Sequence, residues 1–249
     1  MRLLIDIGNT SAKIAVCQGE DIIHFERREE NWGSLFDRIT DKFSINSCTV
    51  SNVARIDNDL LITLERQVFP VTWLTYKTEC PVKRECVAPN GLGADRWAAD
   101  IGAMSLLRKK AAMSEDGKWD MPTLLVIDAG TCITYDLIAP DGHFIGGNIS
   151  PGVELRLKSM HEHTALLPLI HSNGETPFMG YDTETAMRSG AVIGAELEIE
   201  GFVRRTLELY DDAQIFITGG DHFNFSDDIL KRVNIEPMLV FKGLMCIPN

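Results

Sequence analysis

The sequence lacks a long apolar run, since no stretch of its 249 residues approaches the ~20 apolar residues that a membrane-spanning helix needs. Its first ten residues, MRLLIDIGNT, also lack the uninterrupted apolar stretch and the cleavage site of a signal peptide. Apolar residues nevertheless make up 45% of the chain, enough for a hydrophobic core. We therefore expect a cytoplasmic globular protein that has no membrane partner.

Basic residues are scarce. The chain has 24 Lys and Arg against 36 Asp and Glu, which gives a net charge of −12. This balance argues against general affinity for nucleic acids, which requires clustered basic side chains. It does not exclude a phosphorylated small ligand, because backbone N–H groups and metal ions can hold phosphates within an acidic protein.

Several familiar motifs are also missing. None of the six cysteines forms a C-x-x-C pair, and a disulfide between Cys80 and Cys86 is not expected in a reducing compartment. No G-x-x-x-x-G-K-[ST] phosphate loop occurs, and no G-x-G-x-x-G follows a predicted strand. The common nucleotide folds that depend on these motifs are therefore excluded.

The sequence does contain one motif that occurs twice. Residues 3–10 read LLIDIGNT and residues 124–131 read LLVIDAGT, about half the chain apart. Each copy is an apolar run followed by Asp, one apolar residue, Gly and a short polar side chain. A repeat of this length predicts two domains of similar topology.

The pattern around each copy supports this duplication. In both halves, three strands joined by tight turns precede alternating helices and strands, which predicts an α/β fold. In the first half the predicted helices cover 32–43, 58–69 and the stretch from Asp95 onward. In the second half helices are expected from about 153, over 183–210 and from 227, before a last strand. A polar segment at 114–122 suggests domains of 1–118 and 119–249.

The residues of the first copy suit a phosphate. Gly8 lets a ligand approach the backbone, Asn9 and Thr10 offer short donors, and Lys13 adds a positive charge. Asp6 ends a buried strand, where a carboxylate needs a partner. A tight hairpin turn alone would favour the same residue types, but the second copy makes that explanation less satisfactory.

Two further motifs make the pattern specific. Thr218-Gly219-Gly220 follows an apolar strand, and the three glycine motifs in this order resemble those of the actin, sugar-kinase and heat-shock ATPase superfamily. Gly93-Ala94-Asp95-Arg96 then opens a helix. Together with LLIDIGNTSAKIAV, VIDAGTCITYDLI and GGNISPG, it resembles the type III pantothenate kinase family from Leu3 to about Gly220.

The resemblance implies two ribonuclease-H-like, actin-like ATPase domains with the active-site cleft between them. It also implies ATP-dependent phosphorylation of pantothenate to 4'-phosphopantothenate, the first step of coenzyme A synthesis, by a homodimer. Asp95 matches the catalytic base, and the substrate contacts match Gly93, Ala94, Asp95, Arg96 and Thr183. The ATP contacts match Asp6, Ile7, Gly8, Asn9, Thr10, Ser11, Ala12, Lys13 and Thr131. Asp6 matches a Mg²⁺ site that acts through water, and Asp128 matches a potassium or ammonium site.

Simpler explanations exist for three of these residues. Asp95 suits the first turn of any helix, Thr183 suits a helix N-cap, and Asp128 could instead serve Mg²⁺. Cys86 stands where many family members carry an aromatic residue, which affects one wall of the expected pantothenate pocket. Alternative functions are a kinase for another small hydroxy acid or sugar, or a non-catalytic transcription accessory protein.

Overall fold

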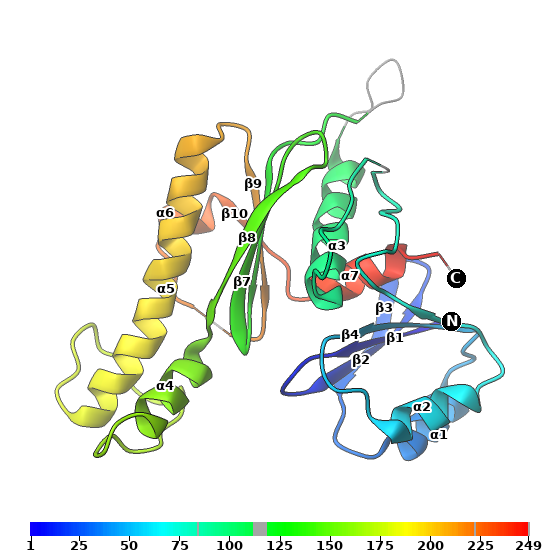
Figure 1. Cartoon of the computed structure of the whole chain (residues 1–249), viewed down its shortest axis with the longest axis horizontal. Coiled ribbons are helices and arrows are strands. Elements are labelled where there is room, and N and C mark those ends of the chain that lie inside the picture. Colours follow the sequence, from blue (N-terminus) through cyan, green and yellow to red (C-terminus); the bar gives the residue numbers. More distant parts are fainter. Residues whose placement is uncertain (84, 112–118, 222, 249) are drawn as a thin grey trace. The chain divides into compact units, whose positions relative to one another are not determined.

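The computed structural model describes residues 1–83, 85–111, 119–221 and 223–248, which form two compact units (Figure 1). The first unit comprises Met1–Met121, Asp141–Phe144 and Met238–Asn249. The second comprises Pro122–Pro140 and Ile145–Pro237. Relative to the boundary expected near residue 118, the first unit therefore also takes in a short hairpin tip and the segment from Met238 onward.

The first unit is built on a five-stranded sheet with the order β3-β2-β1-β4-β5. Strand β1 runs antiparallel to β2 and parallel to β4, and β4 runs parallel to β5. The strands are β1 (Arg2–Ile7), β2 (Ala12–Gln18), β3 (Asp21–Arg27), β4 (Ser47–Asn52) and β5 (Val71–Trp73). Helices α1 (Trp32–Lys42) and α2 (Asn58–Glu65) bury one face of this sheet through an apolar cluster that includes Ile5, Trp32 and Leu60.

The opposite face of the first sheet is covered by α3 (Ala94–Lys110) and α7 (Leu239–Cys246), which contact β1 and β4. The two helices pack closely because each has a glycine at the crossing. A Cβ on Gly102 would clash with the carbonyl of Leu239, and one on Gly243 would clash with the carbonyl of Ala98. Because strand side chains alternate, residues of β1 that do not join the α1–α2 cluster point toward α3.

The second unit repeats this plan. Its sheet has the order β10-β9-β6-β7-β8, in which β6 runs antiparallel to β7 and parallel to β9. The strands are β6 (Leu124–Ala129), β7 (Cys132–Ile138), β8 (Phe144–Pro151), β9 (Gln214–Gly219) and β10 (Val233–Ile235). Reading β6 for β1 and β9 for β4 gives the same neighbours and directions, so the predicted duplicated α/β fold is confirmed.

Helices α4 (Val153–Glu162) and α5 (Thr183–Leu209) cover one face of the second sheet (Figure 1), and α6 (Asp227–Leu230) follows β9. A partly buried polar cluster ties α4 and α5 to the strands. Glu198 accepts hydrogen bonds from Tyr135, Ser150 and Arg156. Within the described ranges, no helix has both the length and the apolar character required to cross a membrane.

The predicted helices and strands occur close to their expected positions, with one omission. The expected last strand is β10, but the chain continues into α7, which was not predicted. Its sequence, LVFKGLMC, has a central glycine and only two helical turns, so helical periodicity is hard to detect. The helix forms because Gly243 packs against α3.

Candidate active site

The turn after β1 is a four-residue loop that leaves two short polar side chains exposed. Ile7 pairs with Ala12 across the hairpin, and the N–H of Gly8 donates to the carbonyl of Ser11 at 3.1 Å. Asn9 and Thr10 lie at the exposed tip. The turn therefore presents polar groups at the end of a rigid sheet, as a phosphate-binding loop requires.

Asp6 lies just before this turn, on the sheet face that α3 covers. It pairs in register with Lys13 on β2 and Ser51 on β4, so these three side chains lie side by side. Only 6% of Asp6 is exposed, and its Oδ1 has no hydrogen-bond partner in the described structure. A buried carboxylate oxygen without a partner is costly, and it indicates that this atom is reserved for a ligand.

The electrostatics of Asp6 agree with this interpretation. Burial raises its pKa from 3.8 to about 6, the positive charge of Lys13 opposes the rise, and the negative charge of Asp95 adds to it. The influence of Asp95 shows that the two carboxylates lie near each other. The fold thus brings together Asp6, Lys13 and Asp95, which are far apart in sequence.

Asp95 occupies the first turn of α3, as predicted. Gly93 is the N-cap, and a Cβ on it would lie 2.7 Å from Oδ1 of Asp95, so glycine gives that carboxylate room. The backbone N–H of Arg96 donates to the same oxygen at 2.7 Å. Burial raises the pKa of Asp95, and the hydrogen bond and charge of Arg96 oppose the rise. Ala94 is buried beneath this turn, and Arg96 is half-buried beside it.

A cavity of about 290 Å³ opens on the other side of the β1–β2 turn. Two arginines line it together with the turn. Arg28 forms an ion pair with Asp57 at 3.3 Å and stacks on Trp32 at 4.6 Å. Arg55 is exposed, and its side chain makes no hydrogen bond or ion pair with the described residues. Neither arginine was predicted from the sequence, because neither belongs to a recognisable motif.

The residues around Asp6 suit a magnesium ion held partly by water. Among the described residues, no three or more His, Cys, Asp or Glu side chains are grouped so that they could hold a metal ion. Mg²⁺ usually keeps several waters and takes one or two carboxylates together with substrate phosphates. The unpartnered oxygen of Asp6, close to Asp95, fits that pattern of ligands.

The equivalent turn of the second unit follows β6. Asp128 pairs in register with Thr134 on β7 and Thr218 on β9, so neutral hydroxyl side chains stand where Lys13 and Ser51 flank Asp6. The loop is one residue shorter, and the N–H of Gly130 donates to the carbonyl of Cys132 at 3.0 Å. Thr131 is exposed in this loop.

Gly219 supports this second turn. Its φ is +113°, and a Cβ would clash with the carbonyl of Ala129. That same carbonyl accepts from the N–H groups of Gly220 and Asp221, at 2.9 and 3.1 Å. The close backbone crossing alone accounts for glycine at position 219.

Thr183 is the first residue of α5 and is exposed. The alternative that it caps this helix is wrong, because the N-cap is Asp182. The Asp182 side chain accepts from the N–H of Thr185 at 2.8 Å, and the Thr185 hydroxyl accepts from the N–H of Asp182 at 3.1 Å. This reciprocal pair completes the cap, so the Thr183 side chain is not needed for it.

Known proteins match this chain closely. The family model described as type III pantothenate kinase matches residues 2–205. The chain belongs to the type III pantothenate kinase family. A type III pantothenate kinase of Bacteroides fragilis is 36% identical over 249 residues, which is all of this chain and 98% of that one. One of Porphyromonas gingivalis is 30% identical over 97% of this chain and 95% of its own length.

The solved structures agree on the fold. A protein from Campylobacter jejuni described as a Baf family transcriptional activator superposes with a TM-score of 0.57 and 22% identity, over 98% of this chain and 96% of that one. At this identity the likeness concerns the fold alone. The expected family and fold are thus confirmed, and the roles of individual residues rest on the geometry described above.

Proposed function

We propose that this protein transfers the γ-phosphoryl group of ATP to the primary hydroxyl of pantothenate, giving 4'-phosphopantothenate. The observation that carries this proposal is the buried carboxylate of Asp6 together with the half-buried carboxylate of Asp95, near the exposed β1–β2 turn. Phosphoryl transfer depends mainly on positioning and on stabilising negative charge. The two carboxylates would position the hydroxyl and Mg²⁺, whereas Lys13 and the bound Mg²⁺ would stabilise the negative charge.

Asp95 acts as the base that orients the hydroxyl and accepts its proton. Its raised pKa brings the carboxylate nearer to neutral pH, where proton transfer to it is more effective. The backbone N–H of Arg96 holds one carboxylate oxygen, which leaves the other for the substrate. The Arg96 guanidinium suits the substrate carboxylate, and Gly93 and Ala94 keep this helix end uncrowded.

The β1–β2 turn holds the ATP phosphates. Residues 8–11 supply short polar groups, Lys13 supplies positive charge, and Arg55 adds a guanidinium from the adjoining cavity. When bound, Mg²⁺ would neutralise phosphate charge, and Asp6 would hold it through water. Ile7 and Ala12 fix the base of the turn by their pairing.

The turn after β6 is proposed to hold a monovalent cation, potassium or ammonium, and to reach the phosphates through Thr131. Asp128 provides one negative charge, and Thr134 and Thr218 flank it with neutral oxygens. Neutral oxygens beside a carboxylate suit a monovalent cation, which needs less compensating charge than Mg²⁺ does.

We also propose a homodimer in which Thr183 contacts the substrate bound to the partner. The segment between α4 and α5 is anchored, since the Arg188 side chain donates to the carbonyls of His171 and Glu175. Yet it exposes large apolar side chains, including 79% of Phe178 and 77% of Met179. An ordered apolar surface is typical of an interface. A Phe178→Asp variant that stays dimeric by light scattering would argue against this surface.

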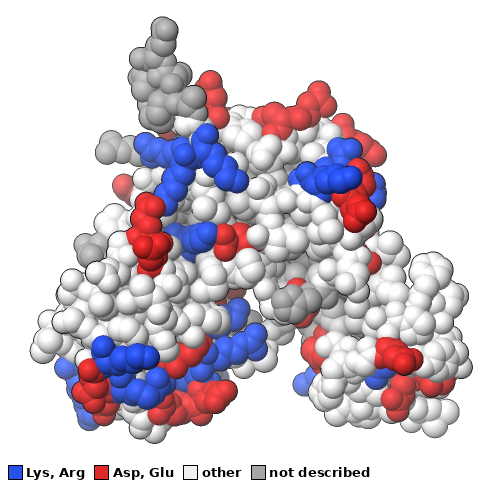
Figure 2. Space-filling view, turned by 180° about the vertical axis from the view of Figure 1, so that it is seen from behind, with Lys and Arg blue, Asp and Glu red and all other residues white. Residues whose placement is uncertain are grey.

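The charges on the face seen in Figure 2 give no support to a nucleic-acid function. On the face seen in Figure 2, Lys and Arg side chains lie next to Asp and Glu. Arg38, for example, pairs with both Glu26 and Glu30, and Arg204 pairs with Asp228. Compensated charges of this kind do not form the basic surface that binds phosphates of DNA.

The test is turnover of pantothenate by the purified protein with ATP, Mg²⁺ and K⁺. Asp95→Asn should lower kcat by roughly 10²–10⁴-fold, the usual contribution of a general base, and should leave ATP binding intact in calorimetry. Asp21→Asn, a change at an exposed strand start, is the matched control. No turnover of pantothenate, with turnover of another hydroxy acid or a sugar in a substrate panel, would refute the proposal.

A further inference from the structure

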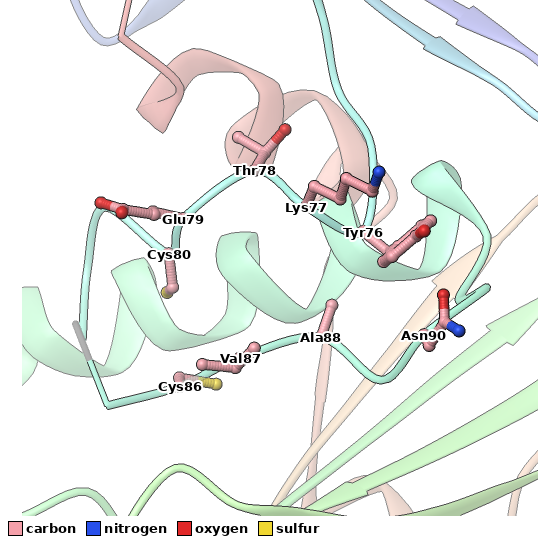
Figure 3. A pocket seen from close by; sticks show the side chains of 9 residues that line it. All are labelled: Tyr76, Lys77, Thr78, Glu79, Cys80, Cys86, Val87, Ala88 and Asn90. Atoms are coloured by element: carbon pink, nitrogen blue, oxygen red, sulfur yellow. The ribbon is translucent and has the colours of Figure 1, made fainter.

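Two cysteines line one cavity of about 810 Å³ in the first unit (Figure 3). Cys80 and Cys86 both lie in the loop between β5 and α3. Both are free, both are buried, and their side chains interact with each other. Two interacting thiols beside a cavity form a pair that can react together.

The surroundings of Cys80 favour its thiolate form. The backbone N–H groups of Val82 and Lys83 stabilise negative charge on its sulfur, and the guanidinium of Arg108 adds positive charge. Arg108 is held in place because its Nη1 donates to the carbonyl of Val82 at 2.6 Å. Interaction with the Cys86 thiol is the largest of these effects, and together they lower the pKa of Cys80 to about 7.

Cys86 has the opposite character. Its interaction with Cys80 and its burial both raise its pKa, so it remains a thiol when Cys80 is ionised. The pair therefore has one nucleophile and one proton-bearing partner. This is the asymmetry found where a reactive cysteine is followed by a resolving one.

The loop that carries the pair is fixed at several points. The indole N–H of Trp97 on α3 donates to the carbonyl of Thr78 at 3.0 Å. At the other cysteine, the backbone of Cys86 packs so closely on Gly142 that a Cβ there would lie 2.9 Å from the Cys86 nitrogen. Gly142 has a φ of +91°, which favours glycine. These contacts hold both thiols beside the same cavity.

We propose that Cys80 and Cys86 form a redox-reactive thiol pair, a modification site whose co-substrate is a small peroxide. The Cys80 thiolate attacks one peroxide oxygen, the O–O bond breaks, and the other oxygen leaves as water after taking up a proton. Cys80 then carries a sulfenic acid. The sulfur of Cys86 attacks Cys80, the S–O bond breaks, and the Cys86 proton leaves with that oxygen as a second water. The peroxide is reduced, and the two thiols are oxidised to a disulfide.

The first test uses the reduced, full-length protein and hydrogen peroxide, followed by alkylation, proteolysis and mass spectrometry. A peptide pair that joins Cys80 to Cys86 should form before any of the other four cysteines is modified. Cys246→Ser, which keeps the pair, should form the link at the same rate. In Cys86→Ser the reaction should stop at a Cys80 sulfenic acid that dimedone traps. Equal oxidation of all six cysteines, or no link, would overturn the proposal.

The second test measures the ionisation of the Cys80 thiol. The rate of iodoacetamide alkylation at Cys80 should rise with pH to a midpoint below that of an ordinary cysteine at ~8.5. Cys86→Ser should move this midpoint upward, because the largest stabilising interaction is lost. An ordinary midpoint in the wild-type protein would contradict the reactive pair. Neither readout depends on kinase activity, so the result is independent of the proposed function.

Discussion

The turns after β1 and β6 occupy equivalent places in two sheets of the same strand order, but their side chains differ. Asp6 is flanked in register by Lys13 and Ser51, whereas Asp128 is flanked by Thr134 and Thr218. Only the first turn lies below a helix that brings a second carboxylate, Asp95. Duplication has therefore preserved the backbone plan, while the charge around each aspartate has diverged.

The difference indicates a division of labour. A carboxylate pair with a neighbouring ammonium group suits a divalent ion, phosphates and proton transfer. We propose that Asp128, whose register neighbours are hydroxyl side chains, serves a more weakly held monovalent ion. If this comparison is correct, equivalent substitutions in the two turns should have different consequences.

The largest expected effect is on catalysis. Asp6→Asn should lower kcat/KM by roughly 10²–10³-fold, a loss typical of removing one group that stabilises developing charge, and should raise the Mg²⁺ concentration needed for half activity. Asp128→Asn should instead weaken the response of activity to K⁺. Steady-state kinetics over a range of each ion measures both. Identical ion responses in the two variants would contradict the assigned division.

A second contrast concerns the glycines that shape the two turns. Gly219→Ala should destabilise the protein by at least ~3 kcal/mol, because it combines a positive φ with a backbone clash. Gly8→Ala should cost under ~1 kcal/mol of stability, since its Cβ would lie 3.4 Å from the Ser11 carbonyl. Chemical denaturation provides the comparison. A well-folded Gly219→Ala protein would show that the crossing at Ala129 can relax.

A third contrast concerns stability and pH. The pKa of Asp6 is raised from 3.8 to about 6, so between these pH values the folded state binds more protons than the unfolded state. The free energy of unfolding therefore falls as pH rises through this window, and ionised Asp6 destabilises the ligand-free protein at neutral pH. Asp6→Asn should be more stable there by up to about 3 kcal/mol.

The measurement is chemical denaturation of both proteins without ligands at about pH 8 and about pH 4, where the advantage of Asp6→Asn should disappear. A stability gain that is independent of pH would show that ionisation of Asp6 is not its cause. Asp128→Asn serves as the matched variant in the second unit.

The smallest expected effect tests the added arginine. Arg55→Gln should raise the KM for ATP by roughly ten-fold, the loss expected for one charge-assisted hydrogen bond, with little change in the KM for pantothenate. Arg66→Gln, an exposed residue just after α2 that does not line the cavity, is the control. Equal KM values for ATP in the two variants would remove Arg55 from the phosphate site.

Sequence patterns predicted the regular parts of this protein well. The buried strands ending at Asp6 and Asp128, the α3 helix beginning beside Asp95 and the long α5 helix all have strong periodicity or clear turn residues. Such patterns involve residues that are close together in the sequence, so a single sequence is enough to detect them.

The features that were not predicted depend on contacts between residues that are far apart in the sequence. Helix α7 is stabilised by a glycine crossing with Gly102, and Ser51 matters only because β4 lies beside β1. Arg55 joins the site because a loop passes the β1–β2 turn. The alternative that Thr183 caps α5 was one residue late, since Asp182 and Thr183 both suit an N-cap and the reciprocal bonds with Thr185 decide between them.

The packing of α7 on α3 also has a consequence for protein synthesis. A ribosome makes α3, then the whole second unit, and only afterwards the residues of α7. Until α7 emerges, the Gly102 face of the helix that carries Asp95 lacks its partner. The second unit can fold as soon as it is complete, whereas the first must wait for it. The Asp6–Asp95 pair therefore reaches its final packing only after α7 has been synthesised. In a product truncated before Leu239, the helix that carries Asp95 would lack the helix it packs against.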